Sequence, residues 1–90
     1  MVVKAEINYE RLPEGLQGGV QRYIEDGIRP GSFLQSVISN YLMGAVCKAD
    51  DINRGRMVDI VKFFYNEAPM SCWGSKEKME QWIKEGGMSE

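Results

Sequence analysis

The chain has 90 residues, with 11 lysines and arginines against 13 aspartates and glutamates, and no histidine. This length gives one domain, residues 1–90, because a second would have no core of its own. The net charge of −2 excludes the basic excess by which proteins usually hold polymeric nucleic acid. Without histidine, the chain lacks the commonest transition-metal ligand, so we expect no metal and no cofactor.

The two cysteines, Cys47 and Cys72, are expected to be free thiols. The first ten residues contain no apolar run of signal-peptide length, which favours a reducing, cytoplasmic environment. No stretch approaches the roughly 20 apolar residues of a membrane span. We therefore expect no membrane partner.

The first predicted helix runs from Pro13 to Asp26 and stops at Gly27. Proline suits the first turn of a helix, and glycine commonly follows the last. Residues 1–12 before it are mixed in character and expected to be extended. The apolar face of this helix repeats at a spacing of three to four residues: Leu16, Val20, Tyr23 and Ile24.

The second predicted helix is capped by Ser32 or Gly31 and reaches about Val46. Its broad apolar face consists of Phe33, Leu34, Val37, Ile38, Tyr41, Leu42 and Ala45. Asn40 falls within this helix on the side of the apolar residues. A buried amide needs a hydrogen-bond partner, either a neighbouring backbone group or a ligand.

The third predicted helix begins after an N-cap at Asp50-Asp51 and ends before Pro69. A short loop then leads to Ser75, the predicted N-cap of a last helix that ends at Gly86-Gly87.

Together these elements predict an all-α, compact domain of about four helices over residues 13–86, preceded by the extended N-terminal segment. The hydrophobic content of 43% is generous for a short chain, and a homo-oligomer would bury part of it.

Two junctions combine a glycine, a hydroxyl and an aromatic residue at a predicted helix start: Pro30-Gly31-Ser32-Phe33 and Trp73-Gly74-Ser75. A helix start attracts anions, glycine lets a ligand approach the backbone, and an aromatic ring offers a stacking surface. Two alternatives remain open. The junctions either hold a phosphate and a nucleobase, or they are N-caps whose apolar neighbours pack into the core.

Further candidates for ligand binding flank these junctions. Tyr65 and Asn66 lie at the end of the third helix, near Trp73 in the sequence. Arg29 and Arg54 are the favoured phosphate contacts, because the guanidinium fork matches phosphate oxygens. We predict no catalytic residue and no enzymatic activity, because neither cysteine has a histidine to activate it.

Several motifs make residues 12–83 resemble a widespread family of small proteins carried by tailed bacteriophages and prophages. They are Pro30-Gly31-Ser32-Phe33-Leu34, Ala49-Asp50-Asp51-Ile52-Asn53, Tyr65-Asn66 and Cys72-Trp73-Gly74-Ser75. The chain departs from the family at Tyr41, where an aspartate is usual. If that aspartate contacts a ligand, the departure alters the ligand preference.

In size, phage origin and helical layout this family resembles the anti-CBASS sponges, which form tetramers and sequester cyclic dinucleotides without degrading them. The resemblance implies a phage immune-evasion protein of the host cytoplasm. It would bind a cyclic oligonucleotide or a cyclic ADP-ribose isomer as a homo-oligomer, a tetramer by analogy. The alternative is a phage adaptor or inhibitor that docks on a host enzyme, with Trp73 as an interface hot spot. A virion or regulatory component is a third reading, but the basic groove that would favour it is missing.

Overall fold

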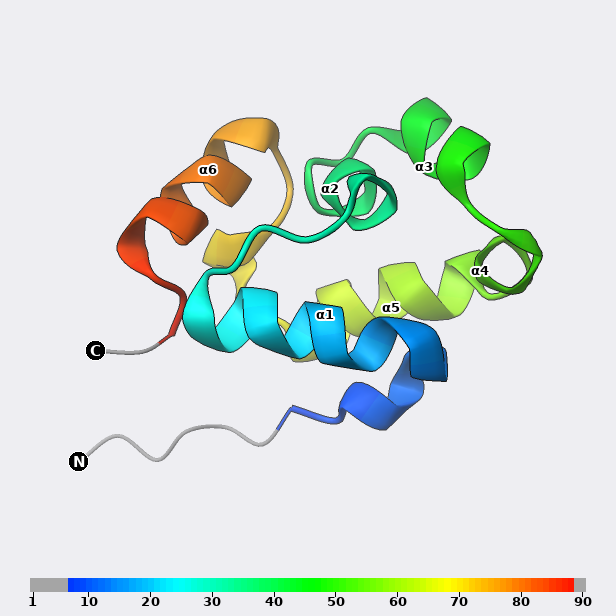
Figure 1. The fold of residues 1–90 in the computed structure, drawn as a ribbon, viewed down its shortest axis with the longest axis horizontal. Coiled ribbons are helices and arrows are strands. Elements are labelled where there is room, and N and C mark those ends of the chain that lie inside the picture. Colours follow the sequence, from blue (N-terminus) through cyan, green and yellow to red (C-terminus); the bar gives the residue numbers. More distant parts are fainter. Residues whose placement is uncertain (1–6, 89–90) are drawn as a thin grey trace.

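The computed structural model describes residues 7–88, and within that range all regular secondary structure is helical, without a strand (Figure 1). Its α-helices are α1 (Glu14–Asp26), α2 (Ser32–Ile38), α3 (Leu42–Lys48), α4 (Asp51–Gly55), α5 (Met57–Glu67) and α6 (Lys76–Glu85). Two 3-10 helices, η1 (Tyr9–Arg11) and η2 (Met70–Cys72), complete the order. The predicted all-α compact class is confirmed.

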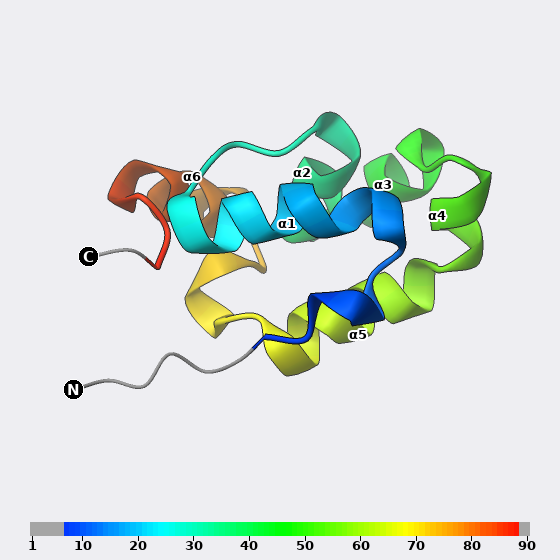
Figure 2. The same cartoon turned by 60° about the horizontal axis from the view of Figure 1, so that its bottom comes forward.

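The N-terminal segment is described only in part. Residues 1–6 of the predicted extended segment lie outside the described range. The rest includes η1, which lies beside α5 (Figure 2). Ile7 and Tyr9 pack against the core, and the Tyr9 ring lies 5.7 Å from that of Phe63.

The core lies between α1 and α5 and is closed at one end by α6 (Figure 2). The face predicted for α1 is confirmed, since Leu16 packs against the core and the other three residues are buried. The largest buried side chains of the three helices are Tyr23, Ile24, Ile60, Phe63, Phe64, Met79 and Trp82.

Buried hydrogen bonds fix the C-terminal half of α1. The Tyr23 hydroxyl donates to the backbone carbonyl of Cys72 at 2.6 Å, which ties α1 to η2. The indole N–H of Trp82 donates to the carbonyls of Tyr23 and Ile24, at 3.0 and 3.2 Å. These bonds position η2 and α6 and therefore the loop that carries Trp73.

The ends of α1 and α6 meet through two glycine backbones. Gly27 and Gly87 have φ angles of +70° and +78°, which side chains other than glycine rarely adopt. A Cβ atom at Gly27 would lie 2.7 Å from the Gly87 nitrogen. Only glycine therefore allows this approach. The predicted helix ends at Gly27 and Gly86 are confirmed, and so is the N-cap Ser75, whose hydroxyl accepts from the Lys78 N–H at 3.1 Å.

The second predicted helix is wrong as one continuous element, because Asn40 divides it into α2 and α3. Asn40 has a φ of +66°, a left-handed conformation that asparagine tolerates better than other non-glycine residues. The Tyr41 N–H donates to the Ser36 carbonyl at 2.8 Å, and the Asn40 N–H to that of Val37 at 3.1 Å. This is a Schellman helix end, and it turns α3 against α2.

The third predicted helix is also divided, at Arg56. Gly55, a poor helix former, ends α4, and the Arg56 N–H is shared between the carbonyls of Ile52 and Asn53. Asp50 caps α4 as predicted, because its carboxylate accepts from the Asn53 N–H at 2.7 Å. No helix within the described range is long and apolar enough to cross a membrane.

Replacing Gly27 by alanine should destabilise the protein by about 2–5 kcal/mol, the sum of left-handed strain and backbone overlap. The matched control is Gly86→Ala. Gly86 has a similar φ of +82°, but an added Cβ would meet nothing within 4 Å. The control should cost only about 1–2 kcal/mol. Urea unfolding of both variants checks this, and equal losses would contradict the close backbone approach.

Candidate functional site

A shallow apolar hollow lies between the α2–α3 turn and α5. Its volume is about 50 Å³. Asn40, Tyr41 and Leu42 form one side, and Met57 and Val61 of α5 form the other. The left-handed turn creates this hollow, because it places Tyr41 and Leu42 at the surface. The predicted continuous helix would have placed both residues in the core.

Asn40 brings polar chemistry to the apolar hollow. The sequence predicted a buried amide inside a helix, but the structure shows an exposed residue at the helix end. Its side-chain amide forms no hydrogen bond with any described residue. The amide is therefore available to a ligand as both donor and acceptor.

An aromatic pair adjoins the apolar hollow. Tyr65 lies one helical turn after Val61 on α5 and is 74% exposed. Its ring centroid is 6.3 Å from that of the half-buried Trp73, at an interplanar angle of 64°. The indole nitrogen of Trp73 is enclosed and finds no acceptor among the described residues. An enclosed donor without a partner is costly and marks the loop as a place where a further acceptor would stabilise the protein.

Gly74 connects this aromatic pair to the α2–α3 turn. Its N–H donates to the Ile38 carbonyl at 2.7 Å, two residues before Asn40. Its φ of +117° favours glycine. The structure thus brings Asn40, Tyr65, Trp73 and Gly74 of the predicted site to one region.

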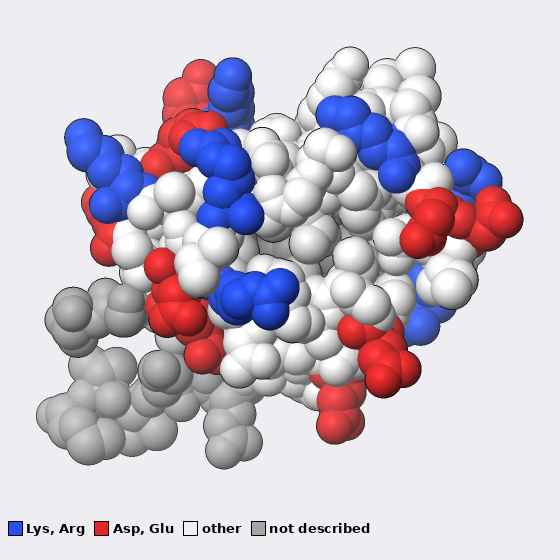
Figure 3. All heavy atoms as spheres, viewed as in Figure 1, with Lys and Arg blue, Asp and Glu red and all other residues white. Residues whose placement is uncertain are grey.

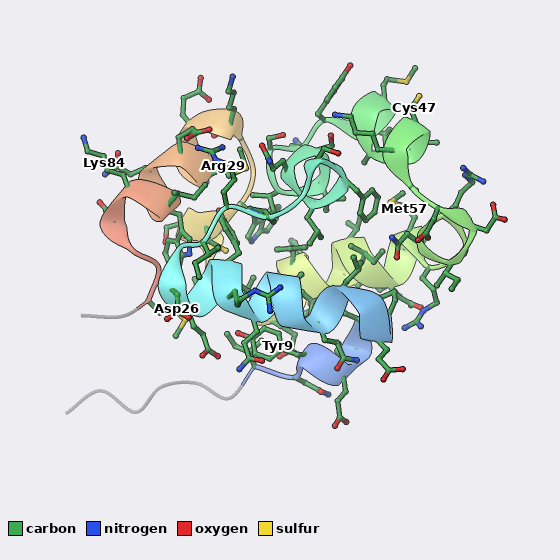
Figure 4. All side chains as sticks on the ribbon, viewed as in Figure 1. Tyr9, Asp26, Arg29, Cys47, Met57 and Lys84 are labelled. Atoms are coloured by element: carbon green, nitrogen blue, oxygen red, sulfur yellow. The ribbon has the colours of Figure 1, made fainter. Side chains whose placement is uncertain are left out.

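The two predicted arginines lie elsewhere and are engaged. Arg29 lies beside α6 (Figure 4), and its guanidinium forms a bidentate ion pair with the Glu80 carboxylate through hydrogen bonds of 2.8 and 2.7 Å. These hydrogen bonds raise the pKa of Arg29 and lower that of Glu80. Arg54, on α4, donates to Asp51 at 3.1 Å and to the Ala49 carbonyl at 2.9 Å. Each arginine would have to leave its partner to contact a phosphate.

The first junction is ordered around the start of α2. Pro30 is buried, and its carbonyl accepts from the Gln35 side chain at 2.8 Å. Gly31 occupies the N-cap position, so Ser32 is the exposed first residue of the helix. Phe33 is half-buried against the core. At the other junction, Asn66 is exposed at the end of α5, and Ser75 is occupied as the cap of α6.

The surface formed by α3, α4 and α5 is rich in exposed apolar side chains. We call it the α3–α5 apolar surface and define it as Tyr41, Leu42, Met43, Val46, Ile52, Val58, Val61 and Tyr65. Such a concentration of exposed apolar residues is typical of an interaction site.

The cysteines differ in their surroundings. Cys72 is fully buried, and burial raises the pKa of its thiol to about 12, so it stays protonated near neutral pH. Cys47 is exposed on α3 (Figure 4). The residues the structure describes contain no group of three or more carboxylates and cysteines close enough to hold a metal ion.

Two lysines of this region were not predicted from the sequence. Lys48 and Lys76 line a second, polar hollow on the other side of Tyr41. They are far apart in the sequence, and only the reversal at Asn40 brings the end of α3 near α6.

No protein-family model, curated protein or solved structure matches this chain. Any assignment of function therefore depends on the chemistry of its own residues and on the resemblance of its motifs.

Proposed function

We propose that this protein is a non-catalytic binding protein that sequesters a nucleotide immune signal, of the cyclic dinucleotide or cyclic ADP-ribose type. The observation that supports this most is the aromatic pair Tyr65–Trp73 beside an apolar hollow that carries the unpaired amide of Asn40. The resemblance to phage proteins and anti-CBASS sponges supplies the biological role, immune evasion in the host cytoplasm.

The chemistry of the hollow suits a nucleobase. A base is a flat apolar ring with hydrogen-bonding edges, and stacking on an aromatic side chain contributes about 1–3 kcal/mol per base. Tyr65 offers an exposed ring. Asn40 offers an amide that can pair with a base edge, and the apolar wall formed by Met57 and Val61 excludes water. Trp73 limits the motion of the Tyr65 ring by packing against it.

A second copy of the chain would complete the site. The hollow of about 50 Å³ is far below the roughly 300–1,000 Å³ of an ordinary ligand pocket. Tyr41, Leu42 and Val61 line the hollow and also belong to the α3–α5 apolar surface. Association through that surface would cover a ligand from both sides. This supports the homo-oligomer, a tetramer by analogy with the sponges.

The side chains present support sequestration rather than cleavage. The chain has no histidine, and the raised pKa of the Cys72 thiol removes a nucleophile from the interior. Binding without turnover requires only shape, stacking and hydrogen bonds, all of which the site region offers.

Isothermal titration calorimetry against cyclic dinucleotides, cyclic trinucleotides and cyclic ADP-ribose isomers tests this function. We expect micromolar or tighter binding to at least one of them, with the ligand recovered intact by chromatography. Tyr65→Ala should weaken binding about tenfold, because it removes the stacking ring. Asn40→Gly should also weaken it, since glycine keeps the left-handed turn and removes only the amide. The control Ile28→Ala alters an exposed residue of the α1–α2 connection. No heat with any nucleotide would refute the proposal.

The α3–α5 apolar surface also supports a second candidate function, a phage adaptor or inhibitor that docks on a host enzyme. Its exposed apolar side chains would then contact a different protein rather than a second copy. Affinity purification distinguishes the two functions, because an adaptor would retain a host protein and a sponge would retain an ultraviolet-absorbing small molecule.

Self-association gives a separate test. In size-exclusion chromatography with light scattering, we expect the wild-type protein to elute as a homo-oligomer. Leu42→Glu, which places a charge on the α3–α5 apolar surface, should yield monomers. Leu42 is 66% exposed, so this change should not unfold the protein. Ile28→Glu, at a residue 50% exposed outside this surface, should leave the oligomer intact. A monomeric wild-type protein, or equal effects of both changes, would contradict the proposed interface.

A further inference from the structure

A polar hollow of about 250 Å³ lies between α2, α3 and α6. Two serines of α2, its C-cap Ser39, Lys48 of α3 and Lys76 of α6 contribute to its wall, and Tyr41 lines both this hollow and the apolar hollow. The upper outline of the molecule dips between α6 and α3, and basic side chains lie on both sides of the dip (Figure 3). No aspartate or glutamate is among the described residues that line this hollow. The charged residues that line it are therefore both basic, on a chain whose net charge is −2, although acidic side chains lie next to the basic ones on the α6 side (Figure 3).

The two lysines are available to a ligand. Lys48 makes one long hydrogen bond, 3.4 Å from its ammonium nitrogen to the hydroxyl of the buried Ser36, which holds its side chain toward the hollow. Neither lysine forms an ion pair with any of residues 7–88. Each ammonium group thus retains N–H donors for an incoming acceptor.

The Arg29–Glu80 pair explains why Lys76 is unpaired. Glu80 lies four residues after Lys76 on α6, a spacing at which a lysine and a glutamate usually interact. Both oxygens of the Glu80 carboxylate are instead held by Arg29, at 2.7 and 2.8 Å. Arg29 therefore occupies the hydrogen-bonding positions of this carboxylate, while Lys76 forms no ion pair with Glu80 and acts on it only through its charge, which contributes to the lowered pKa of Glu80.

The donors and the size of the polar hollow suit a phosphate or diphosphate group. Two ammonium groups match several negatively charged oxygens, and bonds between charged partners are stronger than neutral ones. The hydroxyl of Ser32, on the exposed first residue of α2, is a further donor. The hydroxyl of Ser39 already donates to the Gln35 carbonyl at 2.7 Å and so contributes no free hydrogen. A space of about 250 Å³ is below that of a pocket for a whole nucleotide, but it accommodates its charged part.

We infer that the polar hollow is the anion-binding part of the ligand site, where Lys48 and Lys76 hold a phosphate or diphosphate group. The identity of the ligand as a nucleotide rests on the proposed function. Its negative charge is inferred independently, from the lysines that line the polar hollow. The Tyr41 ring stands between the two hollows, so a nucleotide that spans it would place its base beside Asn40 and its phosphate beside the lysines.

Inorganic pyrophosphate tests the anion site without a nucleobase. We would titrate it into the full-length ¹⁵N-labelled protein at low, constant ionic strength, because salt screens exposed charges. Saturable amide shifts are expected at the start of α6 and along α2. Lys48→Met and Lys76→Met keep most of the apolar stem and remove the charge, so each should weaken binding about tenfold. The control is Lys84→Met, an exposed lysine near the other end of α6, which should bind as the wild type does.

The outcomes separate this inference from the proposed function. Absence of saturable shifts, or an equal loss in Lys84→Met, would overturn the anion site. If a cyclic nucleotide binds but both lysine variants bind it with wild-type affinity, the anion site is also wrong while the proposed function stands. If pyrophosphate binds through the two lysines and no nucleotide does, the anion site is supported and the nucleotide function fails.

Discussion

The left-handed turn at Asn40 is the constraint from which the rest of the surface follows. The turn ends α2 with two backbone hydrogen bonds and directs α3 back against it. α3 can pack this closely against α2 because Gly44 has no side chain. A Cβ atom there would lie 2.5 Å from the Tyr41 ring and 3.0 Å from the Ser36 hydroxyl. The close packing of Gly44, Tyr41 and Ser36 therefore fixes where the Tyr41 ring stands.

Tyr41 and Ser36 line both hollows, so the same packing defines an apolar and a basic depression side by side. The turn also exposes Leu42, which a continuous helix would have directed along the core face, and so contributes to the α3–α5 apolar surface. The proposed base binding, phosphate binding and self-association would consequently all depend on one local arrangement. Tyr41 lies at the centre of this arrangement, at a position where the phage proteins that the chain resembles usually have an aspartate. Under the proposed function, an aromatic ring would replace a carboxylate that would repel an anion.

Much of the fold could be predicted from local signals. Gly27, Ser75 and Gly86 mark helix ends by rules that depend only on neighbouring residues, and each is confirmed. The breaks at Asn40 and Arg56 could not be predicted, because the apolar period continues through both. Within the candidate site, Tyr65 and Trp73 are close in sequence and could be paired. Lys48 and Lys76 come together only through tertiary packing, and the engagement of Arg29 by Glu80 depends on where α6 lies.

The dependence of the ligand site on the α2–α3 turn can be measured through the nucleotide affinity of a Gly44→Ala variant, determined by calorimetry beside Gly55→Ala. At Gly55 an added Cβ would meet nothing within 4 Å, so this control should bind as the wild type does. At Gly44 the added methyl group displaces the Tyr41 ring and distorts both hollows, so we predict at least a tenfold loss of affinity, about 1.4 kcal/mol. Wild-type affinity in a folded Gly44→Ala protein would show that the ligand site does not depend on the α2–α3 turn.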